Sequence, residues 1–312
     1  MLKLLNSKFL PPLLLVLALA LPLASQGTTL RQVVTKTIEN TYPYRPGSEL
    51  AVEGEKAEIF VETWAKKEIS IRLEMTAKHR DLTTARKDLE NLDFVTEKAG
   101  LKIFLKNIRK NPDVKSSSEL IIHYYISLPE ECPVYLKSHF GAANISNLRN
   151  RLRINGEYSQ ININNVQGQL DIRTRFGDIL GERIDGNVVI NSRRSDIQLL
   201  DIGGSFLINA QYGELRLSPN ARLADLQINA EKSEVYLFDP IGNPLTYQLT
   251  ASHGKMVLPT EVSITELENS PEVRRVRIRS GREITGQVKV TLDFGTIYLE
   301  KQERELRRQQ NY

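Results

Sequence analysis

Residues 157–210 read EYSQININNVQGQLDIRT, RFGDILGERIDGNVVINS and RRSDIQLLDIGGSFLINA when they are divided into blocks of eighteen. The block before them, HFGAANISNLRNRLRING from His139, keeps the same register. Two longer units begin at Gln211 and Glu231, and a partial unit begins at Ser252. Self-similarity at a fixed period is the signature of a repeat architecture, in which each unit buries its apolar side against its neighbours.

Apolar residues recur at fixed positions within these units. The fifth position holds Ala143, Ile161, Ile179, Ile197, Leu215, Val235 and Met256, and the sixteenth holds Ile154, Ile172, Ile190 and Ile208. Stacked coils bury columns of this kind, so the pattern predicts an all-β fold built on a β-solenoid with repeats of about eighteen residues. Hairpin units in a twisted sheet or a propeller are the alternative, but eighteen residues are too few for a four-stranded blade.

Small residues also stand in register. Gly168, Gly186 and Gly204 share the twelfth position with Asn150 of the first unit. Both residue types tolerate positive φ, so we expect one tight corner in each coil. The third position alternates between glycine and serine from Gly141 onward, which indicates a pairing of units with a period of thirty-six residues.

The N-terminal residues predict export. Lys3 and Lys8 precede an almost unbroken apolar run, which small and polar residues follow, and this is the pattern of a secretory signal peptide over residues 1–25. The apolar run has about fifteen residues, fewer than the roughly twenty that a membrane-spanning helix needs. We expect a periplasmic, cell-surface or secreted protein that contacts a membrane only if this segment stays uncleaved.

The repeats are flanked by regions of a different character. Short alternating runs before them are typical of antiparallel strands, residues 81–92 show helical spacing behind a capping Asp or Thr, and residues 106–118 predict a hairpin loop. The predicted organisation is a signal peptide at 1–25, a mainly β N-terminal unit with one helix at 30–130, a repeat domain at 131–300 with a charged insertion at 260–282, and a polar tail at 301–312.

Composition excludes several classes of protein. The 312 residues are 40% hydrophobic, which is enough for a sizeable core, and they include one cysteine, Cys132. A single cysteine forms no intramolecular disulfide, and it lies too far from the cleavage site to carry a lipid anchor. Cleavage after residue 25 leaves forty basic and thirty-eight acidic side chains, a formal charge of +2. This near balance, together with export, argues against nucleic acid as a partner.

Residues that could support chemistry are few. Glycan-cleaving enzymes on β-helix folds need clustered carboxylates, whereas only Asp178 and Asp196 fall at one position of successive units, where both are typical turn residues. The four histidines have no metal-ligand spacing. We therefore expect no catalytic residue, no cofactor and no metal, with a polysaccharide lyase or hydrolase as the alternative.

A binding surface is a different possibility. The candidate residues are Arg149, Arg151, Arg153, Arg173, Arg175 and Arg193, with the aromatic residues Tyr158, Phe176 and Tyr212 at the second position. Arginines on one side of the coils would hold the carboxylates or phosphates of an anionic glycan or lipopolysaccharide. Interspersed acidic residues favour an ordinary solvated face instead, and the aromatic column is more typical of packing than of a sugar platform. Asn155, Asn191 and Asn209 at the seventeenth position predict a hydrogen-bonded ladder.

Two short motifs resemble those of a known family. The motif Phe-Gly-Asp-Ile at 176–179 and the motif Phe-Gly-Thr-Ile at 294–297 each lie near a Gly-x-Val-x-Ile/Val strand. With the upstream strands, the likeness spans about residues 48–300 and resembles the DUF4097 putative adhesin family, which is related to the head GIN-domain putative autotransporter adhesins. The resemblance implies a right-handed β-helix-like fold and a cell-envelope or surface setting, and it carries no catalytic residue.

These observations together predict an exported, non-catalytic scaffold or adhesin-like protein of the cell envelope. Its expected partner is an envelope or surface polymer such as an anionic glycan, or another protein. The alternatives are an enzyme that acts on a polysaccharide, and an envelope-associated regulatory or assembly factor.

Overall fold

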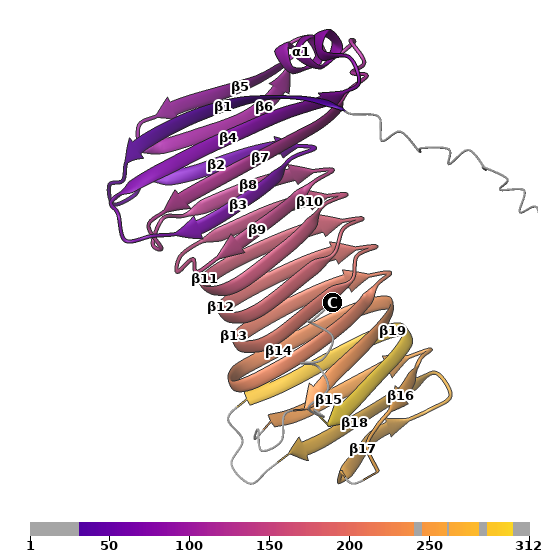
Figure 1. Ribbon diagram of the computed structural model, residues 1–312. Helices are drawn as coiled ribbons and strands as arrows, with labels where there is room; N and C mark the ends of the chain where they lie inside the picture. Colours follow the sequence, from indigo (N-terminus) through magenta and orange to yellow (C-terminus); the bar gives the residue numbers. More distant parts are fainter. Residues whose placement is uncertain (1–30, 240–244, 261, 281–285, 302–312) are drawn as a thin grey trace, which may run out of the picture. The chain divides into compact units, whose positions relative to one another are not determined.

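The computed structural model describes residues 31–239, 245–260, 262–280 and 286–301 (Figure 1). These residues contain nineteen strands, all in one hydrogen-bonded sheet, and one helix. The all-β class predicted from the sequence is therefore confirmed. The signal peptide predicted at 1–25 and all but the first residue of the polar tail lie outside the described residues.

The central strands stack in parallel, each on the next. They are β10 (Leu152–Glu157), β11 (Gln160–Arg175), β12 (Ile179–Arg193), β13 (Ile197–Gln211) and β14 (Glu214–Asp239). Ile161 lies opposite Ile179, and Ile179 lies opposite Ile197, an offset of eighteen residues at each step. This register aligns the apolar columns, and the three isoleucines are at most 1% exposed.

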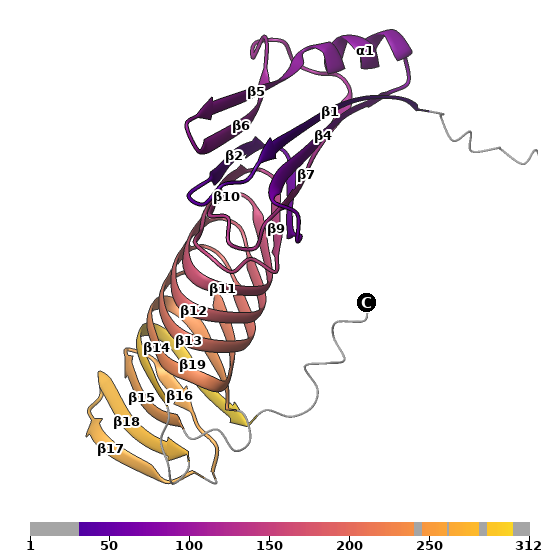
Figure 2. The same ribbon diagram turned by 90° about the vertical axis from the view of Figure 1, so that its left-hand side faces the viewer.

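Each long strand curves around the core, as Figure 2 shows, and so contributes to two faces of the stack. The first face consists of residues 142–146, 160–164, 179–182 and 197–200, and the second face consists of residues 152–157, 170–175, 188–193 and 206–211. Ile163 of the first face and Ile172 of the second face are buried in the same hydrophobic core. Alternate residues on each face therefore point to the core and to solvent.

The backbone turns at more places than the sequence indicates. Positive φ occurs at the twelfth-position glycines, at the second position in residues such as Tyr158 (52°), and at the ninth position in residues such as Asn165 (51°). The corner predicted at the twelfth position is therefore present, and it is one of three positions in the repeat where φ is positive. Asn150 has no positive φ, and its amide instead donates to the Glu131 carbonyl oxygen at 2.5 Å.

The alternation of glycine and serine at the third position has a structural cause. Ser159 and Ser195 are buried, and their Oγ atoms accept the N–H groups of Gly141 (3.3 Å) and Gly177 (3.2 Å) in the preceding units. A Cβ on Gly177 would lie only 2.1 Å from the carbonyl oxygen of Ser159. A serine fits in one coil and no side chain fits in the next, so the units come in pairs.

The stack continues toward the N-terminus. The strands there are β1 (Gln32–Pro43), β2 (Glu49–Glu55), β3 (Glu58–Thr63), β4 (Glu68–His79), β5 (Leu92–Ala99), β6 (Lys102–Arg109), β7 (Glu119–Leu128), β8 (Val134–His139) and β9 (Ala142–Ser146). β2 pairs in parallel with β8 and β6, and β3 pairs in parallel with β9 and β7. Antiparallel β1, β4 and β5 complete this end of the sheet.

The predicted helix is α1 (Leu82–Glu90), and Asp81 caps it by accepting the N–H of Thr84 at 2.7 Å. The hairpin predicted at 106–118 is wrong, because β6 and β7 pair with other strands rather than with each other. Asp88 of α1 instead holds this connection by accepting the N–H groups of Ser117 and Ser118.

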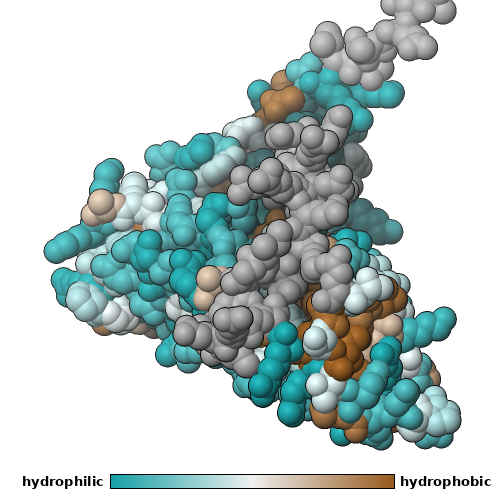
Figure 3. Space-filling view, turned by 90° about the horizontal axis from the view of Figure 1, so that it is seen from below, coloured by the Kyte–Doolittle hydropathy of each residue, from teal (hydrophilic) through white to brown (hydrophobic). Residues whose placement is uncertain are grey.

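At the other end the order of strands departs from the order of the sequence. β19 (Gly286–Lys301) pairs in parallel with β14 on one side and with β15 (Leu245–Ser252) and β16 (Lys255–Val257) on the other. The segment predicted as a charged insertion contains β17 (Ile264–Asn269) and β18 (Val273–Ser280), which pair antiparallel. Figure 3 shows apolar side chains at this end, where Val257 and Leu267 are exposed.

Candidate functional site

A long groove with a volume of about 960 Å³ follows the second face. Strands β8, β10, β11, β12, β13, β14 and β19 line it, mainly through outward side chains at the seventeenth and first positions. The seventeenth-position residues are Lys137, Asn155, Arg173, Asn191, Asn209, Asn229 and Thr291, and the first-position residues are His139, Glu157, Arg175, Arg193, Gln211, Glu231 and Asp293. In-register pairing therefore arranges these side chains in two rows, which we call the second-face groove.

Charge is unevenly distributed along this groove. Three of the predicted arginines, Arg173, Arg175 and Arg193, lie in the part formed by β11 and β12. Of the acidic lining residues, Glu157 of β10 lies opposite Arg175, whereas Glu231 and Asp293 lie in the part formed by β14 and β19. The groove thus has a basic part and an acidic part, separated by neutral amides.

Lys137 adds to the basic part, although an acidic residue holds it. Glu53 lies between Lys106 and Lys137, with nitrogen–oxygen distances of 3.0 and 3.1 Å. Partial burial favours the neutral acid, but the hydrogen bonds from both lysines outweigh it and hold the pKa of Glu53 below its usual range. The Lys137 charge is therefore shared with Glu53, and the main cations of the groove are Arg175, Arg193 and Arg173, the last of which also lies 3.6 Å from Asp171.

The remaining predicted arginines lie elsewhere. Arg151 and Arg153 line a smaller cavity of about 350 Å³, which Arg173 shares. Asp171 lies between Arg153 and Arg173, at nitrogen–oxygen distances of 3.2 and 3.6 Å. Arg149 lines none of these cavities and pairs with Glu130 at 2.8 Å. The six arginines therefore do not form one continuous stripe.

The predicted aromatic residues pack at a corner of the coils. Phe140, Tyr158 and Phe176 form a continuous stack with centroid distances of 5.0 and 4.8 Å. The guanidinium group of Arg194 lies over Phe176 on one side and over Tyr212 on the other. None of these four rings lines the second-face groove.

The polar columns form ladders of hydrogen bonds. Asn209 donates to Asn191 at 3.0 Å, and Asn229 donates to Asn209 at 2.9 Å, whereas Asn155 donates to the Tyr135 hydroxyl. The predicted ladder thus begins at Asn191, because Arg173 occupies the position between it and Asn155.

The two carboxylates that share the fourth position serve the backbone. Asp178 accepts the N–H of Asp196 at 3.0 Å, and Asp196 accepts the N–H of Glu214 at 2.8 Å.

Over the described ranges, no three His, Cys, Asp or Glu side chains are grouped so that they could hold a metal ion. Within the same ranges, no helix has the length and apolar character of a membrane span.

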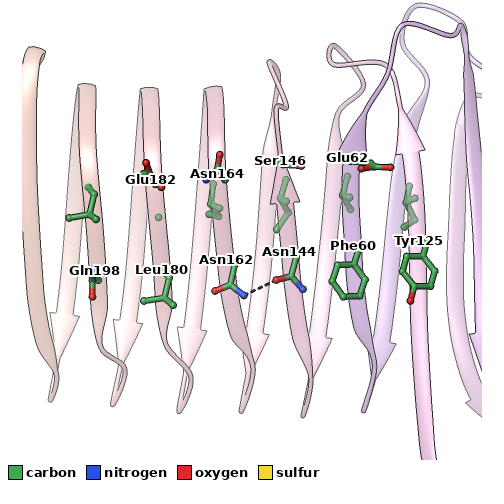
Figure 4. A pocket seen from close by; sticks show the side chains of 16 residues that line it. Phe60, Glu62, Tyr125, Asn144, Ser146, Asn162, Asn164, Leu180, Glu182 and Gln198 are labelled. Atoms are coloured by element: carbon green, nitrogen blue, oxygen red, sulfur yellow. Dashed lines mark hydrogen bonds between the residues drawn. The ribbon is translucent and has the colours of Figure 1, made fainter. Parts of the chain in front are cut away.

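Sequence reasoning missed a second groove of about 670 Å³, which lies on the first face (Figure 4). Phe60 of β3 and Tyr125 of β7 line one end of it, followed by Asn144, Asn162 and other outward residues of β9, β11, β12 and β13. We call it the first-face groove. The sixth-position column was visible in the repeats, but its alignment with Phe60 and Tyr125 depends on long-range strand pairing.

No family model matches the chain, and no curated protein matches it. Similar solved structures include a putative adhesin from Bacteroides fragilis, 11% identical, which covers 85% of this chain and 97% of that chain with a TM-score of 0.47. A putative adhesin from Parabacteroides distasonis is 9% identical, covering 85% and 97%, with a TM-score of 0.42. A putative cell adhesion protein from Clostridium sporogenes is 10% identical, covering 86% and 100%, with a TM-score of 0.26. The resemblance to the DUF4097 putative adhesin family stays a prediction.

Proposed function

We propose that this protein is an exported, non-catalytic, adhesin-like binding protein of the cell envelope, built on a right-handed β-solenoid with repeats of about eighteen residues. The observation that carries the proposal is the register of the parallel strands, which repeats each outward position from coil to coil. Such a surface offers the same contacts at regular spacing, and a linear polymer with its own repeat can use them together.

The proposed ligand is an anionic glycan bound in the basic part of the second-face groove. Arg175 and Arg193 lie on neighbouring strands, about 4.8 Å apart by strand spacing, and Arg173 lies two residues before Arg175. Guanidinium groups bind carboxylates and sulfates through paired hydrogen bonds. The acidic part of the groove confines the polymer to the basic part, because Glu231 and Asp293 repel a further anionic segment.

Binding should decrease when these arginines lose their charge. We expect the triple variant Arg173→Gln, Arg175→Gln, Arg193→Gln to bind a uronic-acid polysaccharide roughly ten- to a hundredfold more weakly, from about 0.5–1 kcal/mol for each exposed contact. Calorimetric titration of the purified mature chain at low and physiological salt measures this change. Binding by the unmodified protein should also weaken as salt rises.

A matched variant distinguishes the loss of a specific site from a general loss of positive charge. Arg149→Gln, Arg277→Gln, Arg279→Gln removes the same charge at positions that line neither groove, so its affinity should stay within about twofold of the unmodified protein. Equal losses in both triple variants would contradict the site, and release of reducing sugar from the polysaccharide would contradict the non-catalytic role. A protein partner becomes the better hypothesis if no anionic polysaccharide binds.

A further inference from the structure

The first-face groove differs in chemistry from the second-face groove, although both follow the same stack. Its lining side chains form two outward rows, which Figure 4 shows side by side. One row contains Tyr125, Phe60, Asn144, Asn162, Leu180 and Gln198, and the other contains Glu62, Ser146, Asn164, Glu182 and Leu200. The lining residues come from six neighbouring strands, which span about 24 Å at the usual strand spacing.

An aromatic platform forms one end of this groove. The Phe60 and Tyr125 rings are nearly parallel, with an interplanar angle of 9° and centroids 5.3 Å apart. Figure 4 shows the two rings side by side with their faces turned to the viewer. The Arg72 guanidinium lies 4.2 Å from the Tyr125 centroid, whereas the nearest ring to Phe60 other than Tyr125 is His123, edge-on with centroids 6.1 Å apart. Phe60 therefore offers the more open ring face. A flat apolar ring of this kind packs against the C–H face of a sugar.

Amide side chains continue the row beyond the platform. Asn162 donates to Asn144 at 2.7 Å, which fixes the orientation of both amides, and Asn164 accepts from Arg183 at 2.6 Å. Asn162 also accepts from the Gln160 amide at 3.3 Å. Each asparagine has two N–H donors and a carbonyl oxygen with two lone pairs, so these bonds leave capacity for further partners. An array of oriented donors and acceptors suits a ligand rich in hydroxyl groups.

The charge of the lining residues distinguishes between anionic and neutral ligands. The residues that line this groove include no lysine, arginine or histidine, and their charged members are Glu62 and Glu182. Glu182 forms an ion pair with Arg183, and Glu62 accepts from the Ser127 hydroxyl at 3.3 Å. The lining itself therefore offers no cation to an anionic polymer, whereas its carboxylates accept hydrogen bonds from neutral hydroxyls.

From these features we propose that the first-face groove binds an extended neutral oligosaccharide, with one sugar stacked on Phe60 and the following sugars hydrogen-bonded to Asn144, Asn162 and Gln198. The site is separate from the arginines of the second face. The protein would then hold two glycans of different charge, one on each face of the coils.

The test is calorimetric titration of the purified mature chain with neutral oligosaccharides of four to six units, covering glucans, mannans and N-acetylhexosamine polymers. Phe60→Ala should weaken binding of the responsive sugar at least tenfold. Leu180→Arg should abolish binding, because Leu180 is 40% exposed in the middle of the groove and a long cation there blocks it without entering the core. Phe294→Ala, which truncates a 46% exposed ring outside both grooves, should leave the affinity unchanged.

Each outcome of these titrations supports or overturns the proposed sugar site. The arginine triple variant of the second face should keep its full affinity for the neutral sugar, so failure at one face is distinguishable from failure at the other. Absence of millimolar or tighter binding across the panel would overturn the inference, as would a Leu180→Arg variant with unmodified thermal stability and unmodified affinity. If an extended peptide binds instead and Leu180→Arg abolishes that binding, the groove is a peptide site and the sugar assignment is wrong.

Discussion

Replacing Gly186 with alanine should lower the free energy of unfolding by roughly 3–5 kcal/mol, the sum of backbone strain and overpacking. Gly186 has a φ of +123°, a conformation that L side chains rarely adopt. A Cβ at this position would lie 2.2 Å from the carbonyl oxygen and 2.7 Å from the nitrogen of Gly168 in the preceding coil. Both obstacles are backbone atoms within a paired sheet, so neither can move without breaking the register of the stack.

Urea unfolding followed by circular dichroism measures this effect, and the melting temperature should decrease by about 10 °C. Gly100→Ala is the matched control, because Gly100 also has positive φ (61°) but its Cβ would meet no heavy atom within 4 Å. That variant should cost only about 1–2 kcal/mol. Equal losses for the two variants would show that close stacking at the twelfth position adds no cost.

The glycine column illustrates how far sequence reasoning reaches. The shared position of Gly168, Gly186 and Gly204 was enough to predict a corner, because glycine is the residue that positive φ selects. The ninth position carried a weaker signal, because Asn147, Asn165 and Asp201 are of residue types that tolerate positive φ. The aromatic residues at the second position, such as Tyr158, gave no such signal.

The candidate sites show a similar limit. Arg153, Arg173 and Arg175 all occupy outward positions of the second face, as their alternation with buried residues indicates. Which of the two cavities each arginine lines depends on its place along the strand and on its distance from Asp171. The eighteen-residue period of the sequence specifies neither. The first-face groove was harder still, because Phe60 is more than eighty residues before Asn144, its neighbour on β9.

The end of the stack could not be predicted from the repeat. The motif at 294–297 revealed that residues 286–299 resemble a unit, but its strand lies between β14 and β15 rather than after β16. The chain passes from β15 through β16, β17 and β18 before β19 pairs with both β14 and β15, and β18 pairs antiparallel with β15.

Removing whole coils should be tolerated better than removing a fraction of one. Deletion of residues 175–210 joins Thr174 to Gln211 and removes two units, so the chain still crosses the first face before it returns to the second. We expect this variant to keep the β-sheet circular dichroism spectrum and a cooperative thermal transition, because stability in a stack is a sum of terms between neighbours. Deletion of the shorter segment 175–201 should abolish cooperative folding. Two segments that belong to the second face would then follow each other in the chain, with no first-face segment between them.

The pairing of units adds a sharper expectation for a single coil. After deletion of residues 175–210, Ser159 is followed by Gly213, and the alternation at the third position is preserved. After deletion of residues 175–192, Ser159 is followed by Ser195, whose Cβ must occupy the place where Gly177 leaves only 2.1 Å to the Ser159 carbonyl oxygen. The eighteen-residue deletion should therefore be less stable than the thirty-six-residue deletion, although it removes half as many residues. Adding Ser195→Gly to the eighteen-residue deletion should then restore part of the loss, because it removes that Cβ. An eighteen-residue deletion that melts above the longer one would show that coils stack independently of the glycine and serine alternation.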